Sequence, residues 1–176
     1  MLAVLTCFQL LGGVARSGTA GQKKHESLLF TCATPPFLSV SVSTVKRTII
    51  PTVEIKVRDP HSREQGVHLI EKKIPRSDYG DVVEIPKAPD DSTERAVEVC
   101  GAVQGEYALT VYEHGDEPYR ITVKVGVGAS LSTYMRPHEG GIRRGRFNFK
   151  VRAGQVELTW LDKNGQPKLN MGDDDW

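Results

Sequence analysis

The stretch RFNFKVRAGQVELTW, from Arg146 to Trp160, decides the fold class because it has the pattern of a β-hairpin. Apolar and polar side chains alternate on both sides of the turn residues Ala153-Gly154. A period of two residues is typical of strands that bury one face, and a short turn containing glycine between two such runs predicts an antiparallel pair. The stretch therefore predicts a half-buried hairpin.

The register of this hairpin follows from its side chains once Arg152 is placed opposite Gln155. Apolar residues then face apolar residues, and a lysine faces a glutamate on the other side. The predicted pairs are Val151 with Val156, Lys150 with Glu157, Phe149 with Leu158, and Phe147 with Trp160. A slip of one residue would place phenylalanines opposite charged residues, so the pattern selects one register.

The same two-residue period recurs along the chain. Residues 38–42 and 53–58 alternate apolar with polar side chains, and 10 prolines and 17 glycines interrupt any helical period. Turn residues separate the short apolar segments at the spacing typical of sandwiches and barrels. We therefore predict an all-β protein with little helix, an antiparallel β-sandwich of immunoglobulin-like or jelly-roll-like type with about seven to nine strands.

A second hairpin is predicted between residues 107–112 and 118–125. The two segments are joined by the short loop EHGDE, and their apolar positions agree when they are folded together. The predicted pairs are Val111 with Tyr119, Leu109 with Ile121, and Tyr107 with Val123.

The first 20 residues are predicted to be a signal peptide. Residues 2–15 form an apolar stretch that is followed by Arg16 and small residues, which is the order of a secretory leader. The stretch is shorter than the roughly 20 apolar residues of a membrane-spanning helix, so we expect no transmembrane span. No basic residue lies between Met1 and Arg16, and a buried N-terminal helix or strand is the alternative. A secretory leader indicates a secreted, periplasmic or cell-envelope protein.

The rest of the chain is expected to hold one folded domain, since 176 residues is close to the usual size of one. Residues 21–36 form a lead-in and a first strand, and residues 37–162 hold the alternating segments of the sandwich. Residues 163–176 are polar and acidic, and we predict that they form a tail ending in GDDDW.

Removal of the leader would leave Cys32 and Cys100 as the two cysteines of the mature chain. An even number of cysteines in an exported protein permits a disulfide, which for so long a loop would contribute on the order of 4 kcal/mol. The phases of the two residues in their strands do not obviously meet. Two separate thiols, one of them packed as a small hydrophobic residue, are the alternative.

The overall charge gives no reason to expect a nucleic-acid partner. Twenty-three Lys and Arg residues stand against 22 Asp and Glu residues, a net charge of +1. The sequence also lacks G-x-S-x-G, G-x-G-x-x-G and the P-loop pattern. We therefore predict a protein that is not an enzyme, with a hydrolase whose site is assembled from loops as the alternative.

Loop residues provide the candidate metal ligands. The carboxylate candidates are Asp78, Asp81, Asp90, Asp91 and Asp116, and the histidine candidates are His61, His114 and His138. Carboxylates are the ligands that Ca²⁺ prefers, but the spacing here does not match an EF-hand loop. Loops at one end of a sandwich can converge on a shared metal. Ordinary solvated turn residues are the alternative, and we predict no cofactor, with calcium as the exception to be tested.

A basic segment near the C-terminus provides a candidate contact face for a polyanion. Its basic residues are Arg143, Arg144, Arg146, Lys150 and Arg152. Strand alternation turns Phe147 and Phe149 inward, so these rings are not available for stacking on nucleic-acid bases. A polyanionic glycan or a lipopolysaccharide surface therefore suits the segment better than DNA, and a solvated strand face is the alternative.

Sugar binding would need exposed aromatic side chains. Tyr79, Tyr112 and Tyr134 lie near predicted turns and are the candidates, whereas Trp160 is expected to point inward.

Three stretches together resemble the bacterial pre-peptidase C-terminal type of β-sandwich and its immunoglobulin-like relatives. They are DPHSREQG (Asp59–Gly66), IPRSDYGD (Ile74–Asp81) and GEYALTVYEHGDEPYRITVKV (Gly105–Val125), and GGIRRGRFNFKV (Gly140–Val151) resembles the closing strand of that family. The resemblance covers most of residues 37–160, although His61-Ser62 replaces the glycine expected before Arg63. It implies an accessory module of exported proteins, often attached to hydrolases, and it implies no catalytic residue.

These features predict an exported, non-catalytic β-sandwich module that acts by surface contact with a protein or an envelope polymer. A carbohydrate-binding or calcium-binding module of the same fold is the first alternative.

Overall fold

The structure is a computed structural model that describes residues 32, 35–44, 52–69, 73–82, 93–126, 128–137 and 141–171. The predicted signal peptide and most of the lead-in lie outside these residues, as do Asp90, Asp91, His138 and the GDDDW end. Within the described residues, no helix has the length and apolar character needed to cross a membrane.

Eleven strands make up the described part of the chain. They are β1 (Phe37–Thr44), β2 (Val53–Arg58), β3 (Glu64–Gly66), β4 (Ser77–Val82), β5 (Thr93–Cys100), β6 (Gly105–Glu113), β7 (Tyr119–Val125), β8 (Ala129–Met135), β9 (Ile142–Arg152), β10 (Gln155–Leu161) and β11 (Pro167–Lys168).

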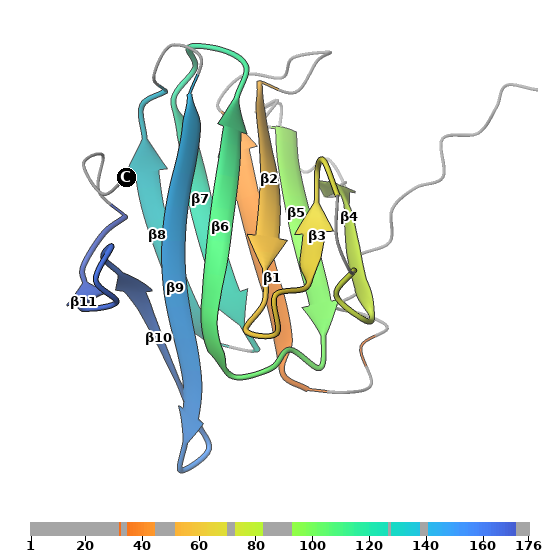
Figure 1. Ribbon diagram of the computed structural model, residues 1–176, viewed down its shortest axis with the longest axis vertical. Helices are drawn as coiled ribbons and strands as arrows, with labels where there is room; N and C mark the ends of the chain where they lie inside the picture. The colour runs from red at the N-terminus through yellow and green to blue at the C-terminus, as the bar shows by residue number, and fades with distance from the viewer. Residues whose placement is uncertain are drawn as a thin grey trace, which may run out of the picture.

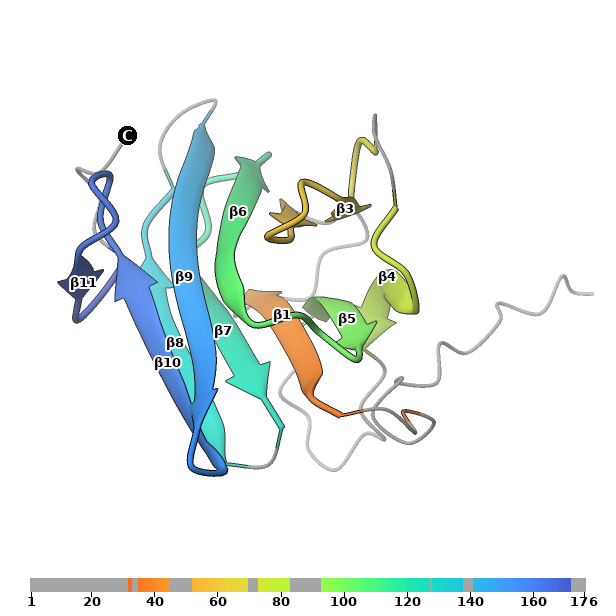
Figure 2. The same cartoon turned by 60° about the horizontal axis from the view of Figure 1, so that its bottom comes forward.

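The strands form two antiparallel sheets that pack against each other (Figures 1 and 2). The five-stranded sheet has the order β4-β5-β1-β7-β8, and the six-stranded sheet has the order β11-β10-β9-β6-β2-β3. This architecture confirms the predicted all-β sandwich. The strand count exceeds the predicted range because β3 and β11 have only three and two residues, too few to show an alternating pattern.

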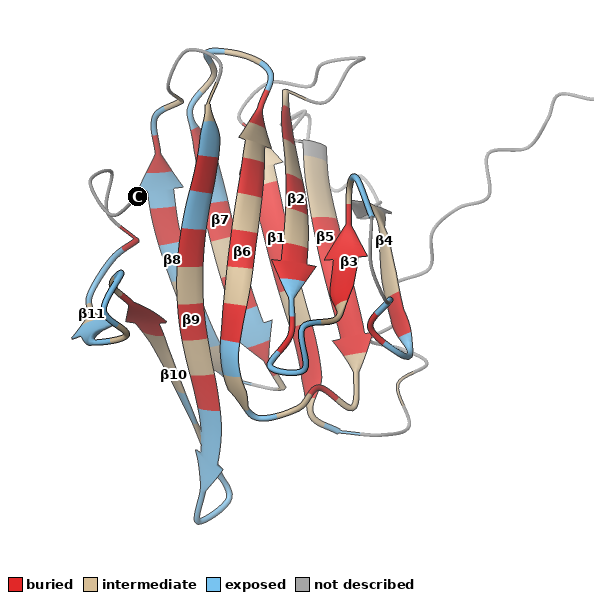
Figure 3. Ribbon diagram, viewed as in Figure 1, coloured by how far each residue is buried: buried red, intermediate tan, exposed pale blue. Residues whose placement is uncertain are grey.

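Alternate side chains of both sheets fill the space between them, which is visible as buried and less buried bands along β6 and β9 (Figure 3). The largest fully buried side chains include Trp160, Tyr107, Tyr119, Phe147 and Phe149. The rings of Tyr107 and Phe147 stack with centroids 5.2 Å apart, and Phe147 meets Trp160 edge to face at 6.0 Å. Because burial of one large apolar side chain contributes about 1.5–3 kcal/mol, this aromatic cluster is a principal anchor of β6, β9 and β10.

The β9–β10 hairpin has the register predicted from its sequence. Arg152 lies opposite Gln155, and the pairing continues unbroken to Phe147 opposite Trp160. Ala153 and Gly154 in the turn have φ angles of 49° and 80°. Two successive positive φ angles are required by the type I′ turn, whose twist matches that of the two strands it joins.

The predicted hairpin between residues 107–112 and 118–125 is wrong. β6 pairs with β2 and β9, whereas β7 pairs with β1 and β8, so the two strands belong to different sheets. The loop between β6 and β7 therefore crosses from one sheet to the other. Both strands turn their apolar side chains into the core, and alternation is the same whether two strands pair within a sheet or stand in opposite sheets.

Residues 163–171, which we predicted to belong to a polar tail, are part of the fold. β11 pairs with β10, and Met171 is buried. A Cβ atom at Gly145 of β9 would overlap the Sδ of Met171, so glycine at this position makes room for the methionine. The predicted boundary at residue 163 is therefore too early, because Leu169 and Met171 in a polar context are too few to give a periodic pattern.

Cys32 and Cys100 form a disulfide, with Cα atoms 5.4 Å apart. Cys100 ends β5, and the bond ties the strand to a segment 68 residues earlier in the chain. The chain-entropy model assigns a loop of this length a stabilisation on the order of 4 kcal/mol. Of the two states that the sequence left open, the structure contains the bonded one.

Candidate functional site

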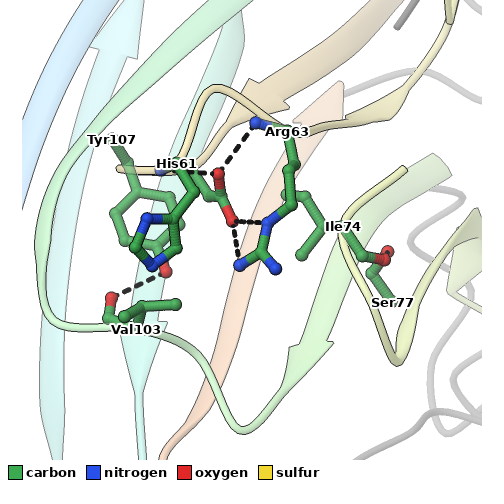
Figure 4. A network of polar contacts seen from close by, with 7 residues as sticks. His61, Arg63, Ile74, Ser77, Val103 and Tyr107 are labelled. Atoms are coloured by element: carbon green, nitrogen blue, oxygen red, sulfur yellow. Dashed lines mark hydrogen bonds and ion pairs between the residues drawn. The ribbon is translucent and has the colours of Figure 1, made fainter. Parts of the chain in front are cut away.

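Asp59 lies in the connection between β2 and β3 and binds His61 and Arg63, which are labelled in Figure 4. Its buried carboxylate accepts hydrogen bonds from the backbone N–H groups of His61 and Arg63, both at 2.9 Å. The Arg63 guanidinium donates to the same carboxylate, with the Nε atom at 2.7 Å. A carboxylate that accepts N–H groups two and four residues later is a common way to fix a tight turn.

Ser62 occupies the position where the family resemblance leads us to expect glycine. Its φ angle of 59° lies in the left-handed region, which glycine adopts without cost and most other residues do not. The structure therefore gives a physical reason for the expected glycine, and the bonds to Asp59 hold the serine in its place.

Tyr107 secures the neighbouring connection, where the chain crosses from β5 in one sheet to β6 in the other (Figure 4). Its hydroxyl donates a hydrogen bond of 2.8 Å to the carbonyl oxygen of Val103. Burial raises the pKa of the Tyr107 hydroxyl, and the negative charge of Asp59 raises it further. The hydroxyl therefore stays protonated and keeps this bond, as in other sandwich domains where a tyrosine holds such a corner.

A hollow of about 350 Å³ lies between these two connections. Its lining includes Asp59, His61, Arg63, Ile74, Arg76 and Tyr107, together with the disulfide residue Cys100. The carboxylate of Asp59 already accepts bonds from the turn and from Arg63, and the hydroxyl of Tyr107 is already donated to Val103. These bonds hold this end of the sandwich together.

A second buried charged cluster lies at the other end of β6. Arg143 donates from Nε to the carboxylate of Glu113 at 3.0 Å and from a terminal nitrogen to the carbonyl oxygen of Arg136 at 2.6 Å. The hydroxyl of Tyr119 donates to the same glutamate. Burial raises the pKa of Tyr119, and the hydrogen bond to the Glu113 carboxylate raises it further. Arg143 is therefore an interior residue and does not belong to the exposed basic face in which we had placed it.

The other basic residues of that face point outward from β9 but differ in the ion pairs and hydrogen bonds that they form. Arg146 binds the Glu106 carboxylate at 2.7 Å and donates to the carbonyl oxygens of Asp162 and Lys163, so it holds the C-terminal segment. Arg152 lies 3.5 Å from Glu157, the same residue that stands opposite Lys150. Arg144 is exposed.

The carboxylate of Glu64 forms ion pairs with the two basic residues of β2 in the same sheet. It lies 2.7 Å from the Arg58 guanidinium and 3.3 Å from the Lys56 ammonium. Burial opposes ionisation of Glu64, but the hydrogen bonds and charges of Arg58 and Lys56 outweigh it and lower the pKa of the carboxyl. The basic residues of β2 are thus neutralised locally.

The two candidate calcium ligands whose side chains the structure describes, Asp78 and Asp116, do not form a common site. Asp78 lies on β4 opposite Glu98, close to the end of β5, whereas Asp116 follows the far end of β6. A strand of nine residues spans about 30 Å, so these two carboxylates lie at opposite ends of the sandwich. Asp81 lies on β4, and its side chain is outside the described set. Among the described residues, no three His, Cys, Asp or Glu side chains gather into a metal-binding group.

The candidate histidines are also separated. His61 lies in the turn after β2, while the N–H of His114 donates to the carbonyl oxygen of Thr52, just before β2 begins. The ring of His114 contacts the carboxylate of Glu54 at 3.2 Å. A metal shared by His61 and His114 is therefore excluded by their positions at opposite ends of one strand.

Only one of the three tyrosines proposed as sugar platforms lies open on a sheet face. Tyr79 turns toward the core and packs against it, and Tyr112 is half-buried, with the ring of His68 edge-on at 5.2 Å. Tyr134 is 69% exposed on β8, and the guanidinium carbon of Arg120 lies 4.3 Å from the centre of its ring. As expected, Trp160 is buried.

Arg120 was missed at the level of sequence because we paired β7 with β6. The correct neighbour of β7 is β8, which places Arg120 opposite Tyr134. The alternation of Arg120, Thr122 and Lys124 was visible, and only the identity of the neighbouring strand was lacking.

Comparisons of this chain with protein-family models, with curated proteins and with solved structures find no match. The resemblance to pre-peptidase C-terminal domains therefore depends on the residues quoted for it.

Proposed function

We propose that this protein is an exported β-sandwich module, immunoglobulin-like or of the pre-peptidase C-terminal type, that acts by surface contact with a protein or envelope polymer and not by catalysis. The single observation that carries the proposal is the distribution of polar groups. The buried charged groups at both ends of the sandwich bind one another, whereas Tyr134 and Arg120 lie open to a ligand on a sheet face.

Two further features support the export part of the proposal. The Cys32–Cys100 disulfide fits an oxidising compartment, since such bonds form and persist mainly outside the cytosol. The apolar stretch of residues 2–15 has the length of the apolar region of a secretory leader and is followed by small residues.

Export is tested by producing the full chain in a secreting host and analysing the released protein. We expect a new N-terminus near residue 15 or 20 and a mass lower by the two hydrogen atoms that the disulfide removes. Retention of Met1 on the secreted chain, or two free thiols, would contradict the export proposal.

The mode of action is tested by comparing binding with turnover. We expect saturable co-sedimentation with purified, insoluble envelope polymer and no hydrolysis of generic ester, peptide or glycoside substrates. Turnover that is lost in a loop variant would contradict the proposal, and failure to co-sediment at any protein concentration would exclude the polymer as the partner.

A carbohydrate-binding module is the second candidate function. The exposed ring of Tyr134 beside Arg120 favours it, because pyranose rings present apolar faces that pack on aromatic side chains.

A further inference from the structure

The outer face of β7 and β8 combines side chains that suit one class of ligand. Outward positions on the two strands pair across the sheet in three rows. The rows are Arg120 with Tyr134, Thr122 with Ser132, and Lys124 with Ser130. All of these side chains except that of Thr122 are classed as exposed, so the face offers an aromatic ring, two cations and a set of hydroxyl groups to solvent.

Tyr134 and Arg120 are arranged as a unit. The guanidinium carbon of Arg120 lies over the Tyr134 ring, 4.3 Å from its centre, and 69% of the tyrosine is still exposed. Stacking restrains the arginine while its N–H groups stay available at the edge of the guanidinium. An arginine held in this way loses little conformational freedom when it binds a carboxylate.

Arg120 and Lys124 face no acidic residue on the adjoining strands β1 and β8, and the acidic residues of the same rows, Glu94 and Glu98, lie two strands away on β5. None of the outward positions of β7 and β8 is acidic, and neither Arg120 nor Lys124 forms an ion pair within the described part of the chain. The hydroxyls between them, Thr122 Oγ1 and Ser132 Oγ, lie 3.2 Å apart and can both donate and accept hydrogen bonds. The face therefore complements a ligand that is negative and rich in hydroxyl groups.

We propose that this face binds an acidic saccharide, specifically an oligomer containing uronic acid. A sugar ring packs on the exposed ring of Tyr134, the Arg120 guanidinium binds the carboxylate of that sugar, and the row formed by Thr122 and Ser132 binds hydroxyl groups. Lys124 lies four residues from Arg120, about 13 Å along β7, and binds the carboxylate of a later sugar unit. The inference rests on the proposed function and names its ligand class.

A single-stranded nucleic acid fits this face less well. Such ligands are held by several aromatic side chains along a groove, whereas β7 and β8 present one aromatic ring on an outer sheet face.

The test is a calorimetric titration of the full chain with tetragalacturonate at low and high salt. We expect binding that weakens as salt rises, and an affinity about tenfold lower in Tyr134→Ala, since a central aromatic contact commonly has that effect. Tyr134→Phe keeps the ring and should stay within about twofold of the wild type. Arg120→Gln should lower the affinity about tenfold and reduce its dependence on salt.

Arg144→Gln on the outer face of β9 is the matched control, because it removes an exposed arginine from the other sheet. It should leave the affinity unchanged. No binding by the wild type, or equal losses in Arg120→Gln and Arg144→Gln, would overturn the saccharide site. Polymer binding that persists in Tyr134→Ala would also overturn it, yet leave the contact function standing, whereas turnover of the saccharide would overturn the contact function itself.

Discussion

The outer face of the six-stranded sheet carries more basic residues than the outer face of β7 and β8, but most of them are already bound. Glu64 holds Lys56 and Arg58, and Arg146 is committed to Glu106 and to backbone carbonyls. The two cations of β7, Arg120 and Lys124, have no acidic neighbour on either adjoining strand. The density of positive charge along a sequence therefore does not give the charge that a ligand meets, because the strands on either side supply the counter-ions.

The largest effect on stability is expected from replacing Arg143, the buried one of two adjacent β9 arginines that point in opposite directions. Arg143→Met removes the positive charge that pairs with the buried Glu113 carboxylate and should lower the free energy of unfolding by about 3–5 kcal/mol. Arg144→Met removes an exposed side chain and should change it by less than about 0.5 kcal/mol. Urea denaturation monitored by tryptophan fluorescence measures both. Similar losses in the two variants would show that Arg143 is not an interior residue.

A smaller effect is expected from Arg146→Met, which releases the segment after β10. The variant loses bonds to Glu106 and to the carbonyl oxygens of Asp162 and Lys163, so we expect a destabilisation of about 1–3 kcal/mol. Hydrogen exchange should accelerate in residues 162–171 before the rest of the sheet. Lys150→Met on the same face is the control. Unchanged exchange in residues 162–171 would rule out the clamp.

Acid should protonate Glu64 and so remove the counter-charge of the basic residues of β2. The pKa of Glu64 is lowered below 4.5, so its ionised form stabilises the folded state above that pH and this contribution is lost as the pH falls through the folded-state pKa. Wild-type stability should therefore decrease from about pH 5 downward, and Glu64→Gln should decrease less. Glu157→Gln, which affects an exposed ion pair, should follow the wild type. Parallel curves for the wild type and Glu64→Gln in acid denaturation series would contradict this account.

The smallest effect is expected at the tip of the β9–β10 hairpin. Ala153 has a φ angle of 49°, where asparagine is better tolerated than alanine. Ala153→Asn should raise the free energy of unfolding by about 0.5–1 kcal/mol, and Ala153→Val should lower it. The midpoint of thermal unfolding measures both changes. A stabilising valine would contradict the assigned turn.

The sequence allowed the β9–β10 hairpin to be predicted to the residue because its information is local. The turn brings the two strands together, and the aromatic pairs are consistent with one register only. The neighbours of β6 and β7 could not be predicted in this way. Their partners lie far away in the chain, and inward alternation is shared by all strands of a sandwich.

The candidate sites were predictable only as far as the strand order was. Arg143 is in phase with Phe147 and Phe149, so the alternation of β9 is enough to place it inward and Arg144 outward, but its buried partner Glu113 is identified only by the structure. Tyr134 was recognised as a candidate platform, but its partner Arg120 became visible only through the β7–β8 register. Met171 was concealed by its polar neighbours.

The most direct measurement is a map of backbone amide chemical shifts in the full chain as tetragalacturonate is added. The account predicts that the shifted resonances cluster on β7 and β8, at Arg120, Thr122, Ser132 and Tyr134 above all. Shifts centred on Arg144 and Arg152 of β9, on the hollow beside Asp59, or nowhere would contradict it.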